Sequence, residues 1–419
     1  MEQKLHTPEG VRDIYNKECE TKLALQKKLS TVLHLYGYQD IQTPTFEYYD
    51  VFREEIGSTS TQELYKFFDR EGNILALRPD ITPSVARAAA TLFENEDFPI
   101  RLCYAGNTFI NHSSYQGRLK ENTQLGAELI GLDSIEADAE MIAMVVDGLK
   151  KVGLKEFQVS IGHVDFIRGL MSGAELGEEE SNEVRALITN RNYFGVEELL
   201  DSRNVKETIR KAFHMLPELV GGAEVLDLAL KAAPDLNARL GVTRLQQIYR
   251  LLKLYGAEDH VTFDLSMSGN YGYYTGVIFR AYTYGTGDAI VRGGRYDHLL
   301  EKFGKNTPSI GFAIIVDELM SALNRQKITV DTVHKNLIVY TEQTEEHAVS
   351  LACSFRGKGR NIELIKREPE EERDIYEEYA RRTDVSAMLY LRDDEKIEML
   401  NLKTGEEKLV DLKSRIKGA

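Results

Sequence analysis

The stretch TQLGAELIG, residues 123–131, places a carboxamide and a carboxylate on either side of a glycine. Side chains of a strand alternate between its two faces, so Gln124, Gly126 and Glu128 share one face and the apolar residues between them face the core. A carboxylate accepts hydrogen bonds and a carboxamide both donates and accepts, so this face suits a small ligand with ammonium or imidazole donors. A solvated sheet face explains the same pattern without a ligand and is the more common case.

Two further groups of residues have the same double interpretation. In DLSMSGNYGYYTGVIF, residues 264–279, the alternation after Tyr271 predicts a strand with Tyr273 and Tyr274 on opposite faces. The two rings either form a wall beside a ligand or are core aromatics with bonded hydroxyls. In RPDIT, Asp80 and Thr82 either bind a ligand or form a turn in which Thr82 caps a helix that begins at Pro83.

Other chemistry has little support in the residues. No histidine lies at metal-ligand spacing from a second histidine or a cysteine, and the chain has neither a GxSxG elbow nor a GxxxxGK[ST] loop. We therefore expect no metal site and no cofactor. The glycine-rich run RGGRYD, residues 292–297, is typical of a tight turn between a strand and a helix.

Composition limits the classes of function. The chain has 419 residues, 42% of them hydrophobic, which predicts two or three globular domains. Its net charge of -15 argues against tRNA binding, because nucleic-acid affinity depends on Lys and Arg that neutralise phosphates. Three cysteines far apart favour reduced thiols. The start MEQKLHTPEG has no apolar signal core and no segment is apolar enough to span a membrane, so we expect a cytoplasmic protein.

The elements that must position these residues are predicted from periodicity. Apolar spacing predicts a helix over 17–36, an acidic helix over 135–152, a strand at FQVSIGH and a helix in GFAIIVDELMSALN, residues 311–324. Between about 172 and 259 the spacing becomes helical throughout, as in a helical insertion. We expect a core over 1–323, a linker over 324–335 and a small α/β domain over 336–419.

Six motifs, taken in order, resemble those of histidyl-tRNA synthetase, a class II aminoacyl-tRNA synthetase. They are GYQDIQTPTFE, LALRPDITPSVARA, GRLKENTQLGAELIG, FDLSMSGNYGYYTGVIF, GGRYDHL and TPSIGFAIIVDEL. The similarity covers about residues 1–323, and the last domain resembles the anticodon-binding domain of that enzyme. The resemblance implies an α+β fold with an antiparallel sheet core of the class II synthetase type, a helical insertion and a small C-terminal α/β domain.

The resemblance also implies a histidine-binding site. Matched by motif, the amino-group side would be Asp80 and Thr82, the strand face Gln124 and Glu128, and the groups around the imidazole Tyr273 and Tyr274. Asp80 departs from the usual glutamate of the synthetase, and RPD in place of RPE is more typical of a noncatalytic relative.

The arginines that the synthetase uses on ATP phosphate and on the reacting carboxylate are missing. Their positions match Ile110 in the second motif, Glu318 in the third and Gly269 in the histidine-specific motif. Adenylation develops negative charge that cations must stabilise, and loss of one such donor costs several kcal/mol, on the order of 3 kcal/mol. We therefore expect no catalysis.

This pattern resembles the regulatory subunits of ATP phosphoribosyltransferase, the synthetase paralogues of histidine biosynthesis. The resemblance implies a noncatalytic subunit that binds L-histidine as feedback effector and assembles with the short-form catalytic subunit into a hetero-octamer. The motif GYQDIQTPTFE implies a homodimer through the core.

Two alternatives stay open at this point. One is a divergent histidyl-tRNA synthetase in which Arg118, Arg292 and Arg295 have taken over ATP binding. The other is an RNA-binding or scaffolding relative that keeps the fold without the ligand.

Overall fold

The computed structural model describes residues 6–53, 59–96, 99–112, 118–203, 205–267, 273–368, 370–392 and 396–411. The chain divides into two compact units, one of Met1–Asp13 and Leu25–Thr329 and the other of Ile14–Ala24 and Val330–Ala419. The predicted boundaries of a core over 1–323, a linker over 324–335 and a domain over 336–419 stay a prediction. No helix of the described part of the chain combines the length and apolar character needed to cross a bilayer.

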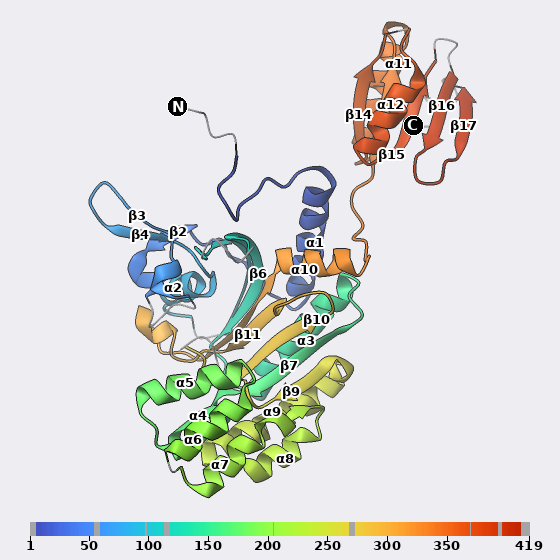
Figure 1. Cartoon of the computed structure of the whole chain (residues 1–419). Coiled ribbons are helices and arrows are strands. Elements are labelled where there is room, and N and C mark those ends of the chain that lie inside the picture. The colour runs from blue at the N-terminus through green and yellow to red at the C-terminus, as the bar shows by residue number, and fades with distance from the viewer. Residues whose placement is uncertain are drawn as a thin grey trace. The chain divides into compact units, whose positions relative to one another are not determined.

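A nine-stranded, mostly antiparallel sheet forms the centre of the first unit among the described residues (Figure 1). Its strands, in spatial order, are β1 (Gln39–Asp40), β5 (Ile100–Phe109), β6 (Glu121–Ile130), β12 (Ser309–Ile315), β11 (Val291–Arg295), β10 (Val277–Thr283), β7 (Phe157–His163), β9 (Val261–Asp264) and β8 (Val220–Gly221). Only the pairs β1–β5 and β7–β9 are parallel. This arrangement confirms the expected α+β class with an antiparallel core.

Strand β6 has the predicted alternation of faces. Leu125, Ala127 and Leu129 are fully buried, and β6 pairs with β5 on one side and with β12 on the other. The strand is therefore central in the sheet, and the side chains of its polar face lie between those of two neighbouring strands.

Helices of the first unit follow the predicted periodicity closely. They are α1 (Asn16–Leu35, shared by the two units), α2 (Thr82–Leu92), α3 (Ile135–Lys151), α4 (Val164–Ala174), α5 (Glu178–Thr189), α6 (Tyr193–Ser202), α7 (Glu207–His214), α8 (Val225–Ala232), α9 (Leu236–Leu254) and α10 (Val316–Arg325). Ser134 caps α3 by accepting a hydrogen bond from the Ala137 amide. The helices predicted between 172 and 259 are present, and α4 to α9 lie together beside β7 and β9 (Figure 1).

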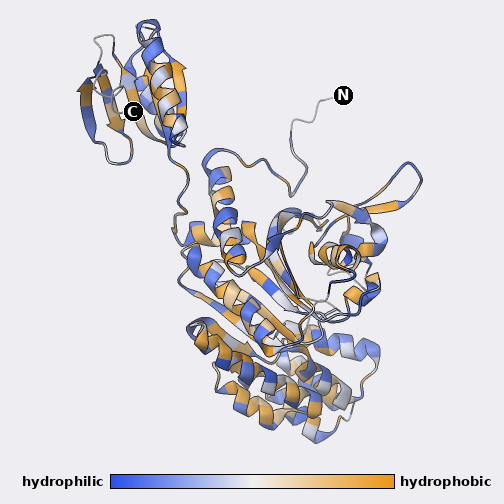
Figure 2. Cartoon of the chain, turned by 180° about the vertical axis from the view of Figure 1, so that it is seen from behind, coloured by the Kyte–Doolittle hydropathy of each residue, from blue (hydrophilic) through white to orange (hydrophobic). Residues whose placement is uncertain are grey.

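These helices are amphipathic, which explains why they gather at one edge of the sheet. Figure 2 shows hydrophobic and hydrophilic residues mixed throughout this helical region. On α9, Val242, Leu245, Ile248 and Leu252 are fully buried at helical spacing. Burying this stripe against neighbouring elements holds the helical region on the sheet.

A separate three-stranded sheet has the order β2 (Phe46–Tyr48), β4 (Ile74–Leu77), β3 (Lys66–Phe68). Its register places Phe46, Tyr48, Phe67, Leu75 and Leu77 on one face, which we call the aromatic face. Phe46, Tyr48 and Phe67 are 51%, 60% and 37% exposed, and the rings of Phe46 and Phe67 pack edge to face at 5.6 Å.

The second unit is a small α/β domain, as its sequence indicates. Its sheet has the order β14 (Asn361–Lys366), β13 (Lys335–Tyr340), β15 (Val385–Leu391), β16 (Lys396–Asn401), β17 (Glu407–Asp411), with helices α11 (Glu345–Gly357) and α12 (Arg373–Arg382). Strand β13 is parallel to both of its neighbours, and two apolar clusters cover the two faces of the sheet around it.

Three local predictions are wrong. Strand β10 begins at Val277, so Tyr273 and Tyr274 precede it and do not alternate across a sheet. In GFAIIVDELMSALN the first five residues complete β12, and the helix begins at Val316. The start of RGGRYD belongs to β11 and is no tight turn. In each case pairing with a neighbouring strand decides the conformation, which a periodicity within one segment does not contain.

Candidate functional site

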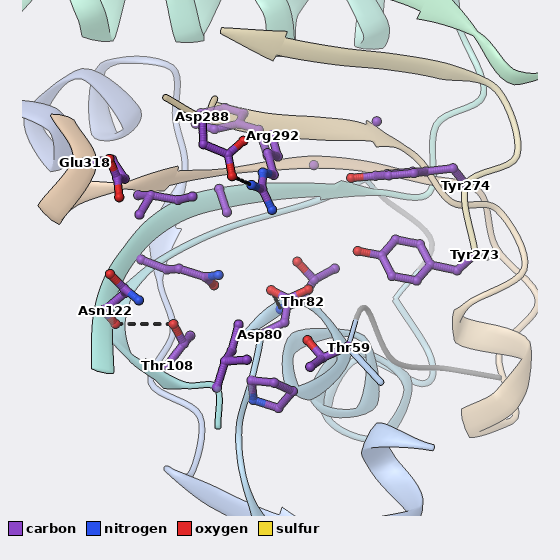
Figure 3. A pocket seen from close by; sticks show the side chains of 18 of the residues that line it. Thr59, Asp80, Thr82, Thr108, Asn122, Tyr273, Tyr274, Asp288, Arg292 and Glu318 are labelled. Carbon is purple, nitrogen blue, oxygen red and sulfur yellow. Dashed lines mark hydrogen bonds and ion pairs between the residues drawn. The ribbon is translucent and has the colours of Figure 1, made fainter. Parts of the chain in front are cut away.

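One cavity of the first unit is lined by all six residues predicted to hold a ligand (Figure 3). These are Asp80, Thr82, Gln124, Glu128, Tyr273 and Tyr274, and the cavity has a volume of about 180 Å³. A single buried water needs only ~15 Å³. The cavity therefore has room for a small polar molecule, and the folded chain brings together residues from three distant segments around it.

Glu128 is the most deeply buried charged group of this cavity, with 0% of its surface exposed. Its Oε1 accepts hydrogen bonds from the hydroxyls of Thr82 at 2.8 Å and Tyr104 at 3.1 Å, and its Oε2 accepts from the Tyr296 hydroxyl at 2.5 Å. Burial raises the pKa of Glu128 to about 8, since these hydrogen bonds only partly offset the loss of water and the Asp80 charge adds repulsion. The carboxyl is therefore poised to gain or lose a proton near neutral pH.

A glycine on the neighbouring strand makes space for this carboxyl. Gly311 of β12 pairs with Glu128 of β6, and a Cβ at Gly311 would lie 1.5 Å from the Glu128 Oε2. Any side chain at Gly311 would displace Glu128 from its position. Sequence spacing alone gave no reason to connect these two residues, since they lie far apart in the chain.

Gln124 offers an acceptor that the protein itself does not use. Its Oε1 is buried and has no hydrogen-bond partner. A buried carbonyl without a partner costs roughly 1–3 kcal/mol, so such groups are rare unless a ligand or water completes them. Gln124 shares its strand face with Glu128, so both groups can act on the same molecule.

Asp80 and Thr82 lie at the start of α2, but Thr82 does not cap that helix. The residue before the helix is Ile81, without a side-chain cap, and the Thr82 hydroxyl instead donates to Glu128. Asp80 Oδ1 accepts a hydrogen bond from the Thr82 amide at 3.3 Å. The capping interpretation of Thr82 is thus wrong, while the turn formed by Asp80 is confirmed.

Tyr273 and Tyr274 form an aromatic wall on one side of the cavity. Their ring centroids lie 4.9 Å apart, and Tyr273 also packs edge to face on Tyr296 at 5.8 Å. Figure 3 shows both hydroxyls pointing into the pocket. Gly294 of β11 permits this arrangement, because a Cβ there would lie 2.7 Å from the Tyr274 ring.

Sequence reasoning missed two tyrosines that hold Glu128. Tyr104 lies opposite Gly126 in the β5–β6 pairing, and Tyr296 follows directly after β11. Burial and the nearby Glu128 raise the pKa of both hydroxyls well above the ordinary value, so both act as donors. The signal for Tyr296 is the motif RGGRYD itself, in which the prediction of a tight turn leaves the tyrosine without a role.

Two of the three residues predicted to replace synthetase arginines line the same cavity. Ile110 and Glu318 are both among its lining residues, so an apolar group and an acid stand where cations were expected in the synthetase. The third position, Gly269, lies outside the described residues.

The three arginines proposed as replacements differ in their surroundings. Arg118 and Arg292 line the cavity, but Arg292 forms an ion pair with Asp288 at 2.6 Å. Burial would raise the pKa of Asp288, yet the charges of Arg292 and Arg118 and the Ala289 amide hold it below the usual value. Asp288 thus offsets part of the positive charge that a phosphate would meet.

Arg295 is a wrong candidate for ATP binding. It is only 2% exposed, pairs with Asp138 at 2.5 Å, and is not among the residues that line the cavity. Its positive charge is neutralised by Asp138 in the protein interior.

One cluster outside the cavity has donor atoms of the kinds that bind metals. In the described part of the chain, His34, Asp40 and Cys103 lie with these atoms within 4.8 Å of one another. His34 and Asp40 hydrogen-bond at 3.0 Å, and Cys103 donates to Asp40 at 3.4 Å. Burial, together with Asp40, raises the pKa of the Cys103 thiol to about 12, so it stays protonated and is a poor ligand. The hydrogen bonds account for the cluster as a link between α1, β1 and β5.

The sequence of this chain is similar to those of known proteins. A family model for histidyl-tRNA synthetase matches residues 10–319. The ATP phosphoribosyltransferase regulatory subunit of Acetivibrio thermocellus is 38% identical over 99% of both chains. That of Thermoanaerobacter pseudethanolicus is 40% identical over 87% of this chain and 95% of its own.

Solved structures agree with these relatives. An ATP phosphoribosyltransferase regulatory subunit/histidyl-tRNA synthetase from Bacillus halodurans C has a TM-score of 0.82 at 30% identity, over 93% of this chain and 99% of its own. Histidyl-tRNA synthetase from Nostoc sp. PCC 7120 has a TM-score of 0.83 at 20% identity over all of both chains, which shows a shared fold. The expected class II synthetase-like fold is thereby confirmed.

Proposed function

The chain belongs to the family of ATP phosphoribosyltransferase regulatory subunits, and on this premise we propose that it binds free L-histidine in the cavity around Glu128. The members of this family are named as regulatory and not as catalytic components of an enzyme of histidine biosynthesis. In the proposal, histidine is the feedback effector, and the protein transmits its effect to a catalytic partner.

The unpaired Gln124 oxygen, in the same cavity and on the same strand face as the buried Glu128 carboxyl, is the observation that carries this proposal. Histidine has ammonium and imidazole N–H donors, and these two groups with Asp80 supply acceptors for them. Tyr273 and Tyr274 supply aromatic surface for a planar ring together with hydroxyls. An anionic ligand would instead meet acceptors and carboxyl groups on this side.

The partner of the proposed complex is the short-form catalytic subunit of ATP phosphoribosyltransferase. We propose that this chain activates that subunit, confers histidine inhibition on it, and forms a homodimer within a hetero-octamer. Histidine would act by binding one state of the complex better than the other, since a ligand shifts an equilibrium only by such a difference in affinity.

A divergent histidyl-tRNA synthetase remains the second candidate, because Arg118 and Arg292 line the cavity. Glu318 and the Arg292–Asp288 ion pair weigh against it, since both lower the local positive charge that ATP phosphates need. The two candidates share histidine binding and differ in adenylation.

Calorimetry of histidine binding to the purified protein, paired with inhibition of the reconstituted complex, tests the proposal. Gln124→Ala should weaken histidine binding at least about tenfold, because it removes the buried acceptor. Gln326→Ala is a matched control, since Gln326 donates to Thr283 and to the Tyr284 carbonyl and is not among the cavity residues. Histidine inhibition should weaken in parallel with binding, while activation of the partner persists.

Two results would contradict the proposal. One is a wild-type protein that shows no histidine binding at millimolar ligand. The other is a Gln124→Ala complex that histidine inhibits as well as the wild type, which would place the regulatory site elsewhere.

A further inference from the structure

The backbone of the aromatic wall is held by helix α4, which does not belong to the cavity lining. The Gly276 carbonyl accepts a hydrogen bond from the Val164 amide at 3.0 Å. The Tyr274 carbonyl accepts one from Arg168 Nη2 at 2.7 Å. A hydrogen bond from a guanidinium is roughly twice as strong as one between neutral groups. The first turns of α4 thus hold both ends of the short segment Tyr274–Gly276.

A second set of contacts holds the middle of the same segment. The Thr275 amide donates to the Arg295 carbonyl at 2.8 Å, and the Thr275 hydroxyl lies 2.9 Å from Asp297 Oδ2. Asp297 Oδ1 in turn accepts from Arg295 Nη1 at 3.1 Å. The wall is therefore fixed from two sides by groups that do not line the cavity.

Each set of contacts includes or adjoins a residue that packs against helix α9 or is bonded through Asp138 to it. The Arg295 guanidinium binds Asp138, which is fully buried, and the second oxygen of Asp138 accepts from Arg244 Nε of α9 at 2.6 Å. One turn earlier on α9, Gly241 packs against His163, the residue before α4, so closely that a Cβ would lie 2.6 Å from its Nδ1. Helix α9 thus contacts Asp138, which binds Arg295, and His163, which directly precedes α4.

We propose that Arg168 and Thr275 are positioning residues for the cavity, and that α4 and α9 together determine where the two tyrosines stand. The proposal rests on the proposed histidine binding for its effect on affinity, but not for the positioning itself. Within the described part of the chain, the hydrogen bond from Arg168 to the cavity lining goes to the backbone carbonyl of Tyr274, and Arg168 itself is not a lining residue. If the two tyrosines are already ordered in the free protein, binding costs no free energy for ordering them. Loss of the hydrogen bonds from Arg168 and Thr275 should therefore weaken binding.

Hydrogen exchange measured by mass spectrometry on the ligand-free protein tests the positioning. Arg168→Ala should speed exchange of amides in residues 274–277, with Arg168→Lys intermediate because a lysine can still donate to the carbonyl. Arg203→Ala is the matched control, because Arg203 also pairs with a carboxylate, Glu180 at 2.8 Å, and its side chain is 56% exposed against 53% for Arg168. Thr275→Val tests the second set of contacts without changing side-chain volume.

The same variants are then titrated with L-histidine. We expect Arg168→Ala and Thr275→Val to bind about three- to tenfold more weakly than wild type while they remain folded at the temperature of the titration, and Arg203→Ala to bind normally. Unchanged exchange in residues 274–277 would overturn the positioning, and faster exchange with unchanged affinity would overturn its role in binding. If exchange rises but the wild type itself binds no histidine, the supports are established and the proposed ligand is wrong.

Discussion

Glu128 is a fully buried carboxyl whose protonation state determines how it can bind a ligand. Three hydroxyl donors surround it, yet its removal from water raises its pKa to about 8. The group is therefore largely protonated at neutral pH in the empty cavity, and a donor placed beside it favours the carboxylate. Replacing Glu128 with alanine would leave three buried hydroxyls without their acceptor, so Glu128→Gln is the cleaner variant because it keeps the shape and an acceptor oxygen.

Histidine binding should release a proton at pH 7. Ammonium or imidazole N–H donors stabilise the carboxylate and lower its pKa from about 8, so affinity should rise as pH increases from 6 to 8. Calorimetry in two buffers of different ionisation enthalpy measures the number of protons released on binding. Glu128→Gln should abolish the proton release that comes from Glu128. Equal binding enthalpies in the two buffers for the wild type would show that Glu128 does not ionise on binding.

The same carboxyl should make the stability of the free protein depend on pH. Its folded pKa is raised above the ordinary 4.5 to about 8, so its contribution is fully present below 4.5 and is lost as pH rises toward 8. The free energy of unfolding of wild type, relative to Glu128→Gln, should therefore fall by an amount on the order of a few kcal/mol between pH 5 and pH 8. Urea unfolding at three pH values measures it, and parallel curves for both proteins would contradict the raised pKa.

At the scale of elements, the aromatic face of the three-stranded sheet exposes its three aromatic side chains, while its two leucines are partly buried. Phe46 and Phe67 pack on each other, and Tyr48 beside them is more than half exposed. Contiguous exposed apolar surface of this kind is typical of protein interfaces. Phe46 also belongs to the motif GYQDIQTPTFE, whose family resemblance implies the dimer contact, so we propose a second copy of this chain as the occupant of the aromatic face.

Phe46→Glu should weaken the homodimer at least about tenfold, because it places a charge in a desolvated apolar contact. Light scattering over a dilution series measures the shift toward monomer. Phe68→Glu is the matched control, since Phe68 lies on strand β3 of the same sheet, on the face opposite Phe46, and is 72% exposed. This face would be excluded as the dimer interface if the wild type is monomeric at micromolar concentration. It would also be excluded if the dimers of both variants dissociate at the same concentration.

At the scale of the whole molecule, the fold of a class II aminoacyl-tRNA synthetase is combined with a negative net charge and with cavity residues that disfavour the phosphates of ATP. The formal net charge is -15, and Ile110 and Glu318 line the cavity where phosphate-binding arginines are expected in the synthetase. Loss of each transition-state cation slows adenylation by roughly two to three orders of magnitude. The family assignment as a regulatory subunit agrees with this loss.

The purified protein should therefore show no histidine-dependent ATP–pyrophosphate exchange. The measurement uses radiolabelled pyrophosphate at saturating histidine and ATP, with an authentic histidyl-tRNA synthetase as positive control. Exchange at rates normal for a synthetase would overturn the noncatalytic interpretation and would favour the divergent synthetase, with Arg118 and Arg292 as the groups to mutate next.

Much of the architecture was determined by local sequence. The helices near 17–36 and 135–152, the strand at 157–163 and the face of β6 followed from apolar periodicity, which reflects burial on one side of an element. The six predicted cavity residues were identified by their types and by family resemblance, and they do line one cavity. Their role in binding stays a prediction.

The tertiary structure alone decided how Glu128 is held and how it titrates. Its partners Tyr104, Tyr296 and Gly311 lie on other strands, and their approach depends on the register of the β5–β6–β12 pairing. Register is a property of paired strands, so no single segment specifies it. The raised pKa likewise follows from complete burial, which the surrounding elements produce together. Arg295, by its charge a candidate for phosphate binding, is instead neutralised by Asp138 because the fold brings α3 beside β11.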